Sequence, residues 1–399
     1  MQNYIKSCKQ QILQDEGSRF EMIIYVVKEG DSVDRIATQF AVPVQWIIEA
    51  NQLAYPYALV IGQALLILTE SFMANRGIFA NGFAYPFINP WVLQQTLPFL
   101  SELSVFSYGF TPEGELIEPV LPVDWMVDEA LTYGTSPVIT LTPFGPDGNF
   151  SNQLIHRMLS NTTARNFLIQ NLYEEVLQGG YRGVNVDFEY ILAEDRDLFT
   201  EFVRDVTLMM EELGGEVTVD LAPKTSADQQ GLLYEGKDYR ALGEAATRVF
   251  VMTYEWGYTY GPAMAVAPLD KVRQVLDYAV SEIPKEKITM GIPNYGYDWT
   301  LPYVRGESKA RTIGNIEAVQ IAIANQAVIE FDEKAQTPYF HYVVGNTTHE
   351  VWFEDARSIW AKYNLLREYP LYGFGCWQIS QLFRPMWLLM DGNVEYIEG

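Results

Sequence analysis

Apolar and polar residues alternate along residues 183–189, Gly-Val-Asn-Val-Asp-Phe-Glu. Successive side chains of a strand point to opposite faces, so a strand here has one apolar face and one face with Asn185, Asp187 and Glu189. Burying two carboxylates costs roughly several kcal/mol each unless they are paired. The pattern therefore indicates either a local polar network or a site of chemistry.

Apolar strands and helical periods alternate over residues 78–399. Eight segments have the composition of buried strands: residues 79–85, 104–109, 137–143, 183–189, 217–223, 249–256, 288–295 and 372–379. Helical spacing of apolar residues marks residues 161–177, 195–213, 269–283 and 354–369. This alternation favours a parallel sheet, and the expected fold is α/β, a TIM (β/α)8 barrel. A doubly wound sheet is the alternative, although no Gly-x-Gly-x-x-Gly or P-loop sequence follows a strand.

The interval between the seventh and eighth expected strands is too long for one loop and one helix. Residues 310–326 have a helical pattern, and three short strand-like segments follow at residues 327–332, 338–344 and 351–353. We expect a small α+β insertion at about residues 303–350.

Residues 23–69 have a pattern of their own. A β-branched strand precedes a turn at Gly30, Asp31 and Ser32, where Ser32 or Asp31 can cap the helix that follows. A second helix and a second strand complete the pattern. We expect a separate βααβ module.

This module resembles a LysM domain. The matching residues are Val27, Gly30, Asp31, Ser32, Ile36, Ala37, Ile47, Asn51, Leu53, Ile61, Gly62, Gln63 and Leu65. The resemblance implies binding of glycans that contain N-acetylglucosamine, chiefly peptidoglycan or chitin. The implied groove lies between Gly30, Asp31 and Ser32 on one side and Tyr55 and Pro56, within residues 52–57, on the other. A helical hairpin that only packs on the barrel is the alternative. A single module should bind weakly, because a tandem array would be needed for avidity.

The charge of the chain excludes some partners. Lys and Arg number 27, Asp and Glu number 51, and the formal net charge of the 399 residues is −24. Such a chain cannot neutralise phosphates, so we expect no nucleic-acid partner and no affinity for an anionic membrane surface. No apolar segment is long enough to span a bilayer.

The histidines, the cysteines and the N-terminal residues limit the kinds of site and location that we expect. Three scattered histidines do not indicate a metal site, and no metal or organic cofactor is expected. A bridge between Cys8 and Cys376 is not favoured, and there is no disulfide framework. Residues 1–22 form a polar tail without the apolar core of a signal peptide. Residues 69–76 form a short linker, and we expect a monomer.

The polar row at residues 183–189 resembles the Asp-x-x-Asp-x-Asp-x-Glu sequence of family 18 glycoside hydrolases. The last two acids are present as Asp187 and Glu189, whereas Arg182 and Asn185 replace the first two. The proton donor of the family is therefore kept, and the supporting positions differ.

Further strand ends match family positions, although each aromatic alone would be read as core packing. The implied substrate contacts are Tyr85, Asn185, Met252, Glu255, Asn294, Tyr295 and Trp377, with Tyr254 among the catalytic residues. Glu255 stands where the family has Asp, and the third strand lacks the family's Ser-x-Gly-Gly sequence. These departures indicate a divergent subgroup rather than an ordinary chitinase.

The resemblance also implies a mechanism. Glu189 protonates the glycosidic oxygen and needs a raised pKa to do so. Asp187, supported by Asn185, orients the 2-acetamido N–H of the sugar, whose carbonyl oxygen attacks the anomeric carbon. Tyr254 holds that carbonyl, and Glu255 and Asn294 bind sugar hydroxyls. Glu189 then activates water, so configuration is retained.

A LysM domain joined to this barrel, with no signal peptide, resembles the spore-associated N-acetylglucosaminidases of endospore-forming bacteria. The resemblance implies cleavage after N-acetylglucosamine in spore cortex peptidoglycan and a spore-associated or cell-wall-associated location. A chitinase or chitooligosaccharidase, a non-catalytic lectin-like protein and a coat protein with a vestigial site remain as alternatives.

Overall fold

The computed structural model describes residues 21–69, 78–144, 150–390 and 393–397. Its centre is a closed barrel of eight parallel strands, because each strand pairs in parallel with its neighbours and the first strand pairs with both the last and the second. In chain order the barrel strands are β3 (Phe79–Ala84), β4 (Glu102–Phe110), β6 (Ser136–Leu141), β7 (Gly183–Val186), β8 (Glu216–Leu221), β9 (Arg248–Val251), β10 (Ile288–Pro293) and β16 (Gly373–Trp377). The TIM barrel prediction is confirmed.

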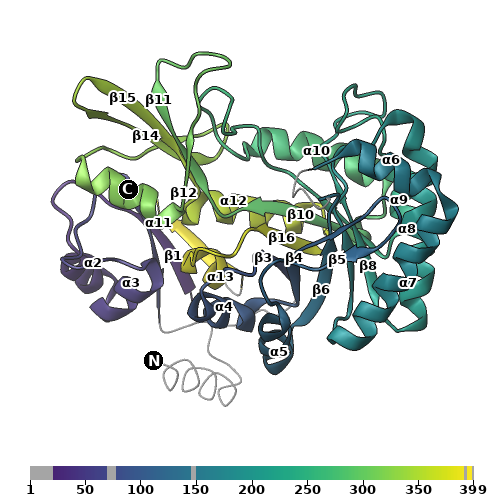
Figure 1. The fold of residues 1–399 in the computed structure, drawn as a ribbon. Coiled ribbons are helices and arrows are strands. Elements are labelled where there is room, and N and C mark those ends of the chain that lie inside the picture. Colours follow the sequence, from purple (N-terminus) through teal and green to yellow (C-terminus); the bar gives the residue numbers. More distant parts are fainter. Residues whose placement is uncertain (1–20, 70–77, 145–149, 391–392, 398–399) are drawn as a thin grey trace.

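Helices surround this barrel (Figure 1). They are α4 (Pro90–Thr96), α5 (Asp124–Tyr133), α6 (Asn152–Ser160), α7 (Thr162–Gly179), α8 (Arg196–Glu212), α9 (Tyr239–Ala245), α10 (Leu269–Glu282), α12 (Ala356–Glu368) and α13 (Arg384–Leu389). Short 3-10 helices lie at Leu97–Phe99, Ala193–Asp195 and Lys285–Lys287, and β5 (Leu116–Ile117) pairs with the end of β4. The helices bury their apolar stripe; α8, for example, turns Phe199, Phe202 and Val206 inward.

The strand expected at residues 183–189 is shorter than the alternation of its residues indicates. β7 ends at Val186, where its pairings with Leu141 of β6 and Val219 of β8 also end. The backbone amide of Asp187 still donates to the carbonyl of Leu141 at 2.9 Å. Phe188 keeps the outward direction and stacks on Phe199 and Phe202, with ring centroids 5.6 and 5.8 Å away. The apolar face therefore packs on a helix, whereas Glu189 lies in the loop beyond the strand.

The insertion between β10 and β16 is an antiparallel sheet with one helix. Its elements are β11 (Gly296–Leu301), β12 (Arg311–Ile313), α11 (Asn315–Ala324), β13 (Glu330–Asp332), β14 (Thr337–Val344) and β15 (Thr347–Trp352). The sheet order is β12-β11-β15-β14-β13. The expected range of 303–350 misses β11, because Gly296 continues from the barrel strand almost without a loop and pairs at once with Ile313.

The N-terminal module is the expected βααβ unit. It consists of β1 (Glu21–Val26), α2 (Val33–Phe40), α3 (Val44–Asn51) and β2 (Ala64–Leu68). Ser32 caps α2 by accepting from the amide of Arg35 at 3.3 Å, whereas Asp31 accepts from Lys28 and Tyr25. Pro43 precedes α3 as its N-cap residue. The expected tail of residues 1–22 and module of residues 23–69 differ from the structure by two residues, because Glu21 and Met22 belong to β1; residues 1–20, with Cys8, and almost all of the linker lie outside the described residues.

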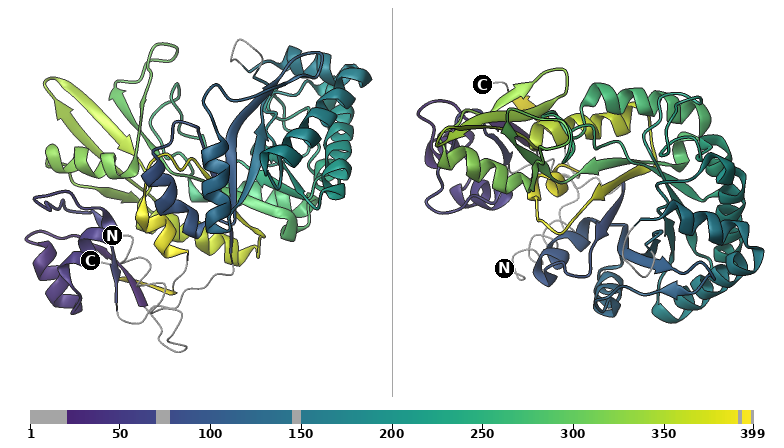
Figure 2. Two further views of the ribbon diagram at one scale, coloured as in Figure 1. Left: turned by 60° about the horizontal axis from the view of Figure 1, so that its bottom comes forward. Right: turned by 45° about the horizontal axis from the view of Figure 1, so that its top comes forward.

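The N-terminal module does not form a separate unit, because it shares a sheet and an apolar core with the rest of the chain. The strand β17 (Asn393–Ile397), which the sequence did not reveal, pairs in parallel with β1 in the order β17-β1-β2. Met22, Ile24 and Leu66 belong to the same apolar core as the barrel. Figures 1 and 2 show the purple module beside the green insertion, with the teal helices α6 to α9 on the other side of the barrel.

The module and the insertion approach each other closely. The amide of Ile329 donates to the carbonyl of Ile61 at 2.9 Å, and Arg357 donates to the carbonyl of Gly62 at 3.1 Å. A Cβ atom on Gly62 would lie 1.8 Å from the carbonyl oxygen of Ile329. Gly62, whose φ is +85°, is required here both by the contact and by its backbone conformation.

Candidate active site

Three neighbouring barrel strands carry acidic side chains at the same end of the barrel. Asp187 and Glu189 follow β7, Asp220 lies near the end of β8, and Glu255 follows β9. Asp187 and Asp220 are buried and Glu189 is half-buried. In this fold, chemistry is expected at the C-terminal ends of the strands, and the acids lie there.

Asn185 points into this group, but not to the acid that we expected it to support. Its side-chain amide donates to a carboxylate oxygen of Asp220 at 2.8 Å. Arg182, which replaces the first acid of the family sequence, is exposed and donates to the carbonyls of Gly180 and Tyr181. The two departures from the family sequence thus have different consequences: the side chain of Arg182 lies outside the site, whereas that of Asn185 contacts Asp220 of the neighbouring strand β8.

Burial dominates the electrostatics of the site. Burial and the charge of Glu189 raise the pKa of Asp187 to about 8, although Lys237 opposes the rise. Burial also raises the pKa of Glu189, with Lys237 opposing and Glu255 adding to the rise. The pKa of Asp220 is raised well above its usual value, first by burial and then by Asp187. A carboxyl that holds its proton near neutrality can act as a general acid.

Tyr254 lies among these acids. It is buried, and its pKa is raised well above the usual value by burial and then by the charges of Asp220, Asp187 and Glu189. A Cβ atom on Gly291 would lie 2.7 Å from its ring, so the glycine makes room for the tyrosine. The hydroxyl is therefore kept protonated and available as a donor.

An aromatic cluster adjoins the acids. The ring of Trp377, at the end of β16, lies 4.9 Å from that of Phe106 and 6.0 Å from that of Tyr85. Tyr85 stacks on Phe87 with centroids 4.9 Å apart and an angle of 13° between the planes. Burial raises the pKa of Tyr85, and the charges of Asp187 and Glu189 add to the rise. The cluster is therefore close to the acids and extends from them to the exposed ring of Phe87.

Two residues expected to bind sugar hydroxyls are engaged within the protein. Glu255 accepts hydrogen bonds from Tyr295 and from Tyr297, the latter at 2.9 Å. Asn294 is buried and donates to the carbonyls of Gln378 and Gln381 at 3.1 and 2.9 Å. Both amide hydrogens of Asn294 are thus committed, and it joins β10 to the loop after β16. Met252 is half-buried against the barrel core.

Two members of the site escaped the sequence analysis. Asp220 interrupts an apolar strand, which is the same signal that marked Asp187 and could have been used. Lys237 gave no such signal, because it stands in a polar stretch, Tyr-Glu-Gly-Lys-Asp, that is typical of an exposed turn. It is nevertheless 1% exposed.

The histidines His156, His341 and His349 lie against Asp195, Glu350 and Asp298 respectively, and the last two stand on the paired strands β14 and β15. Within the described ranges, no three His, Cys, Asp or Glu side chains are arranged to hold a metal ion. Cys376 is buried and free. None of the helices in the described ranges is long and apolar enough to cross a membrane.

On the side of the implied LysM groove that residues 52–57 form, some side chains are exposed and others are engaged within the protein. Tyr55 is 86% exposed and packs edge-on against Tyr57, whereas Gln52 donates to the carbonyl of Leu382 at 3.0 Å and accepts from the amide of Arg384 at 2.7 Å. Gln52 therefore docks the module on α13 and is not free for a glycan.

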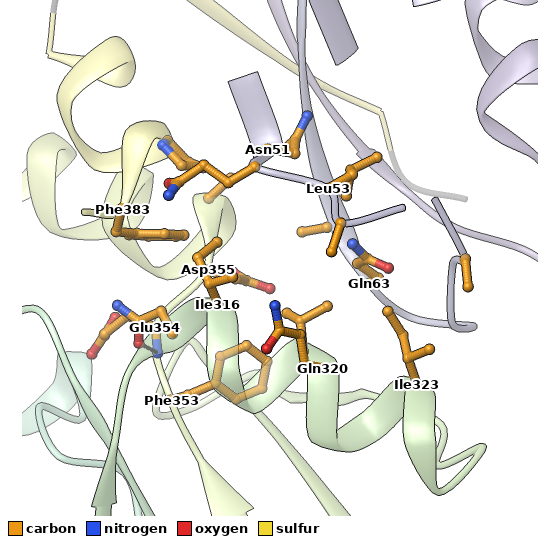
Figure 3. Close-up of a pocket in the computed structure, with 18 of the residues that line it drawn as sticks. Asn51, Leu53, Gln63, Ile316, Gln320, Ile323, Phe353, Glu354, Asp355 and Phe383 are labelled. Atoms are coloured by element: carbon orange, nitrogen blue, oxygen red, sulfur yellow. Dashed lines mark hydrogen bonds between the residues drawn. The ribbon is translucent and has the colours of Figure 1, made fainter. Parts of the chain in front are cut away.

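A pocket of about 190 Å³ lies behind this loop, between the module and α11. Figure 3 shows its mostly apolar lining, with Leu53, Ile316, Ile323, Phe353 and Phe383. Residues 187 and 189 are not part of it, so it is separate from the acidic site.

Comparison with known proteins identifies the class of protein to which the chain belongs. The family model "Glycosyl hydrolases family 18" matches residues 137–381, and the LysM domain model matches residues 25–67. The chain therefore belongs to family 18 of the glycosyl hydrolases, and it is a glycoside hydrolase that carries a LysM domain. Both sequence resemblances are confirmed.

Individual relatives cover nearly the whole chain. The cortical fragment-lytic enzyme of Bacillus subtilis is 34% identical over 94% of this chain and 99% of its own length. The crystal structure of the Bacillus cereus spore cortex-lytic enzyme SleL matches with a TM-score of 0.88 and 30% identity, over 94% of this chain and 99% of that one. A chitinase from Chromobacterium violaceum, at 23% identity and a TM-score of 0.73 over 78% of this chain and 98% of that one, shares the barrel fold.

Proposed function

We propose that this glycoside hydrolase cleaves the β-1,4 bond after N-acetylglucosamine in spore cortex peptidoglycan, with retention of configuration and with the acetamido group of the substrate as the nucleophile. Relatives that cover almost its whole length are named for spore cortex or cortical fragments. The proposed location is accordingly the spore or the cell wall, and the LysM module supplies a second glycan contact.

One observation carries the proposed mechanism. The Oδ1 atom of Asp187 is buried and has no hydrogen-bond partner among the described residues. A buried acceptor without a donor is costly, and an acetamido N–H of a bound sugar would satisfy it. Asp187 is thus suited to orient the acetamido group rather than to attack the sugar itself.

The reaction then divides into two proton transfers at Glu189. In the first step Glu189 gives its proton to the glycosidic oxygen, the bond from that oxygen to the anomeric carbon breaks, and the acetamido carbonyl oxygen bonds to the anomeric carbon. The hydroxyl group of Tyr254 donates a hydrogen bond to the acetamido carbonyl oxygen and keeps its proton. In the second step water attacks the anomeric carbon, Glu189 takes the proton of the water, and the acetamido group is released.

The aromatic cluster supplies the floor for the sugar that is cut. Trp377 is half-buried, with its ring fixed by Phe83, Phe106 and Tyr85. Such a ring presents an apolar face to the apolar face of a sugar. Glu255 contributes indirectly, because it fixes Tyr295 and Tyr297 at the rim.

The test is release of reducing sugar from purified cortex peptidoglycan, with product masses. The wild type should give fragments that end in N-acetylglucosamine, and Glu189→Gln should lower the rate about 10²–10⁴-fold. Glu194→Gln is the matched control, because the Glu194 side chain is 70% exposed; it should keep full activity.

Two results would overturn the proposal. Equal rates on cortex glycan and on the same glycan after de-N-acetylation would exclude the acetamido group as nucleophile. A kcat/KM that is higher on chitooligosaccharides than on cortex fragments would exclude peptidoglycan as the preferred substrate.

A further inference from the structure

Lys237 is a fully buried lysine beside the acids of the site. Its side chain is 1% exposed, and its Nζ atom donates to the backbone carbonyl of Asp220 at 3.0 Å. Burial lowers the pKa of Lys237, and the negative charges of Asp187, Glu189 and Asp220 oppose that change. A buried ammonium is strongly unfavourable unless negative charge surrounds it, so its position requires these carboxylates.

The loop between β8 and α9 is built to hold Lys237 in place. Lys224, at the start of the loop, is buried and donates to the carbonyls of Ala227, Tyr234 and Lys237 at 3.3, 3.4 and 3.2 Å. At the other end, Asp238 caps α9 and pairs with Arg196. The hydrogen bonds of Lys224 therefore hold the loop together, and the ion pair of Asp238 with Arg196 fixes its C-terminal end.

The same loop touches the segment that carries the general acid. A Cβ atom on Gly236 would lie 2.4 Å from the carbonyl oxygen of Ile191 and 2.5 Å from its Cβ atom. Ile191 stands two residues after Glu189. Only glycine permits this approach, which brings the neighbouring Lys237 to the acids.

The three carboxyls lack a matching set of positive groups. Asp187, Asp220 and Glu189 are enclosed, and Asn185 contributes a neutral amide where the family sequence has a third acid on the same strand. The other titratable groups that act on the cluster are Tyr85, Tyr190, Tyr254 and Glu255, all neutral or negative. The position of Lys237 makes it the compensating charge of the cluster.

We propose that Lys237 is a positioning residue that fixes the number of protons held by Asp187, Asp220 and Glu189, so that Asp187 can ionise while Glu189 keeps its proton. This inference rests on the proposed roles of Asp187 and Glu189. The ammonium stabilises one negative charge in the cluster, and the side-chain amide of Asn185 holds the carboxylate of Asp220 by a hydrogen bond. A proton can then pass between the carboxyl groups of the cluster without a proton donor or acceptor from solvent.

The test is the pH dependence of kcat/KM for soluble cortex fragments. In Lys237→Met the limbs that report Asp187 and Glu189 should both move to higher pH by about one to two units, because loss of a positive charge makes each carboxyl harder to ionise. The maximal kcat/KM should fall about tenfold. Lys237→Arg keeps the charge and should leave both limbs within a few tenths of a unit of the wild type.

A matched control separates charge from structure. Lys287→Met removes another lysine that is hydrogen-bonded to backbone carbonyls, those of Gly243 and Ala246, but not a charge that acts on Asp187 or Glu189, so it should lower Tm and leave both limbs in place. Unshifted limbs in a folded Lys237→Met would overturn the proposal and make Lys237 a structural residue.

A second variant decides the matter if Lys237→Met does not fold. Lys237→Gln removes the positive charge but keeps a donor for the backbone carbonyl of Asp220, so both limbs should again move to higher pH; limbs at the wild-type pH would overturn the proposal. Failure of the proposed function is distinguishable, because it would show as retained activity in Glu189→Gln, whatever the lysine does.

Discussion

The side-chain amide of Asn185 donates to the carboxylate of Asp220 at 2.8 Å, across the neighbouring strands β7 and β8. The carboxylate that the family sequence places at position 185 is thus replaced by an amide, and an acid from the next strand lies beside it. Oδ1 of Asn185 is buried and has no partner within the described ranges.

Asn185→Asp would restore the family sequence and should nevertheless impair the enzyme. A carboxylate there faces Asp220 without a donor, and like charges raise each other's pKa. We expect about a tenfold or larger loss of kcat/KM at pH 7 and a lower Tm. An activity at pH 7 equal to that of the wild type would contradict this account of the site.

Asp187→Asn should stabilise the protein in alkaline solution while it removes activity. The pKa of Asp187 is raised to about 8 in the folded state, so the stability it contributes is complete below its ordinary pKa of about 4 and is lost as the pH rises through 8. Because each pH unit between 4 and 8 costs the wild type about 1.4 kcal/mol, the variant should gain about 5 kcal/mol at pH 8.5 and only about 1–2 kcal/mol at pH 5. Thermal unfolding at the two pH values measures this; an equal gain at both would contradict it.

A buried ion pair closes the opposite end of the barrel. Arg248, which begins β9, contacts Glu102, which begins β4, at 2.7 Å, with both side chains buried. Arg248→Met leaves Glu102 without its cation and should cost about 3–5 kcal/mol of unfolding free energy, with unchanged KM. The exposed pair of Arg240 and Glu282 is the matched control: Arg240→Met should cost less than about 1 kcal/mol. Urea unfolding of both variants gives the comparison, and similar losses would refute it.

The exposed ring of Phe87 should extend the sugar-binding floor. Because it stacks on Tyr85 at 4.9 Å, Phe87→Ala should raise KM for long glycans about 2–10-fold, as expected for loss of one aromatic contact, and change kcat less than about twofold. Tyr133→Ala removes a ring of 40% exposure on α5 and should change neither constant. The idea fails if Phe87→Ala alters kcat alone.

Gly62→Ala should loosen the LysM module from the insertion. The added methyl group would meet the carbonyl of Ile329, and the positive φ adds strain, so a loss of about 2–4 kcal/mol is expected. Gly345 also has a positive φ, of 62°, but open space around it, and Gly345→Ala should cost only about 1 kcal/mol. Limited proteolysis between the module and the barrel should accelerate only in Gly62→Ala.

The sequence predicted the elements of the fold because their signals are local. Alternation and helical spacing follow from burial of one face, so β7, α8 and the βααβ module were found, with end errors such as Glu189 in a loop. The strand β17 was missed because its partner β1 lies at the far end of the sequence. Periodicity says nothing about such a partner.

The acids of the site could be predicted for the same reason. Asp187 stands out because a charge in a buried strand needs an explanation, and Asp220 has the same mark. Lys237 and Asn294 do not: a lysine in a polar loop looks solvated, and an asparagine at a strand end can face either a sugar or the backbone. The structure decides both cases: Lys224 donates to the carbonyl of Lys237 and so holds the loop in which Lys237 is buried, and the carbonyls of Gln378 and Gln381 accept the side-chain amide hydrogens of Asn294.

The pairing of β17 with β1 has a consequence for biosynthesis. The ribosome completes β1 early and β17 late, and the barrel strand β3 likewise awaits β16. In the interval the edges of β1 and β3 that these late strands will cover are unpaired, and such edges readily recruit strands from other chains. The barrel closes only after translation has passed the insertion, because β16 follows it in the chain. Protection of the β3 edge from other chains is therefore needed until the insertion and β16 have been synthesised.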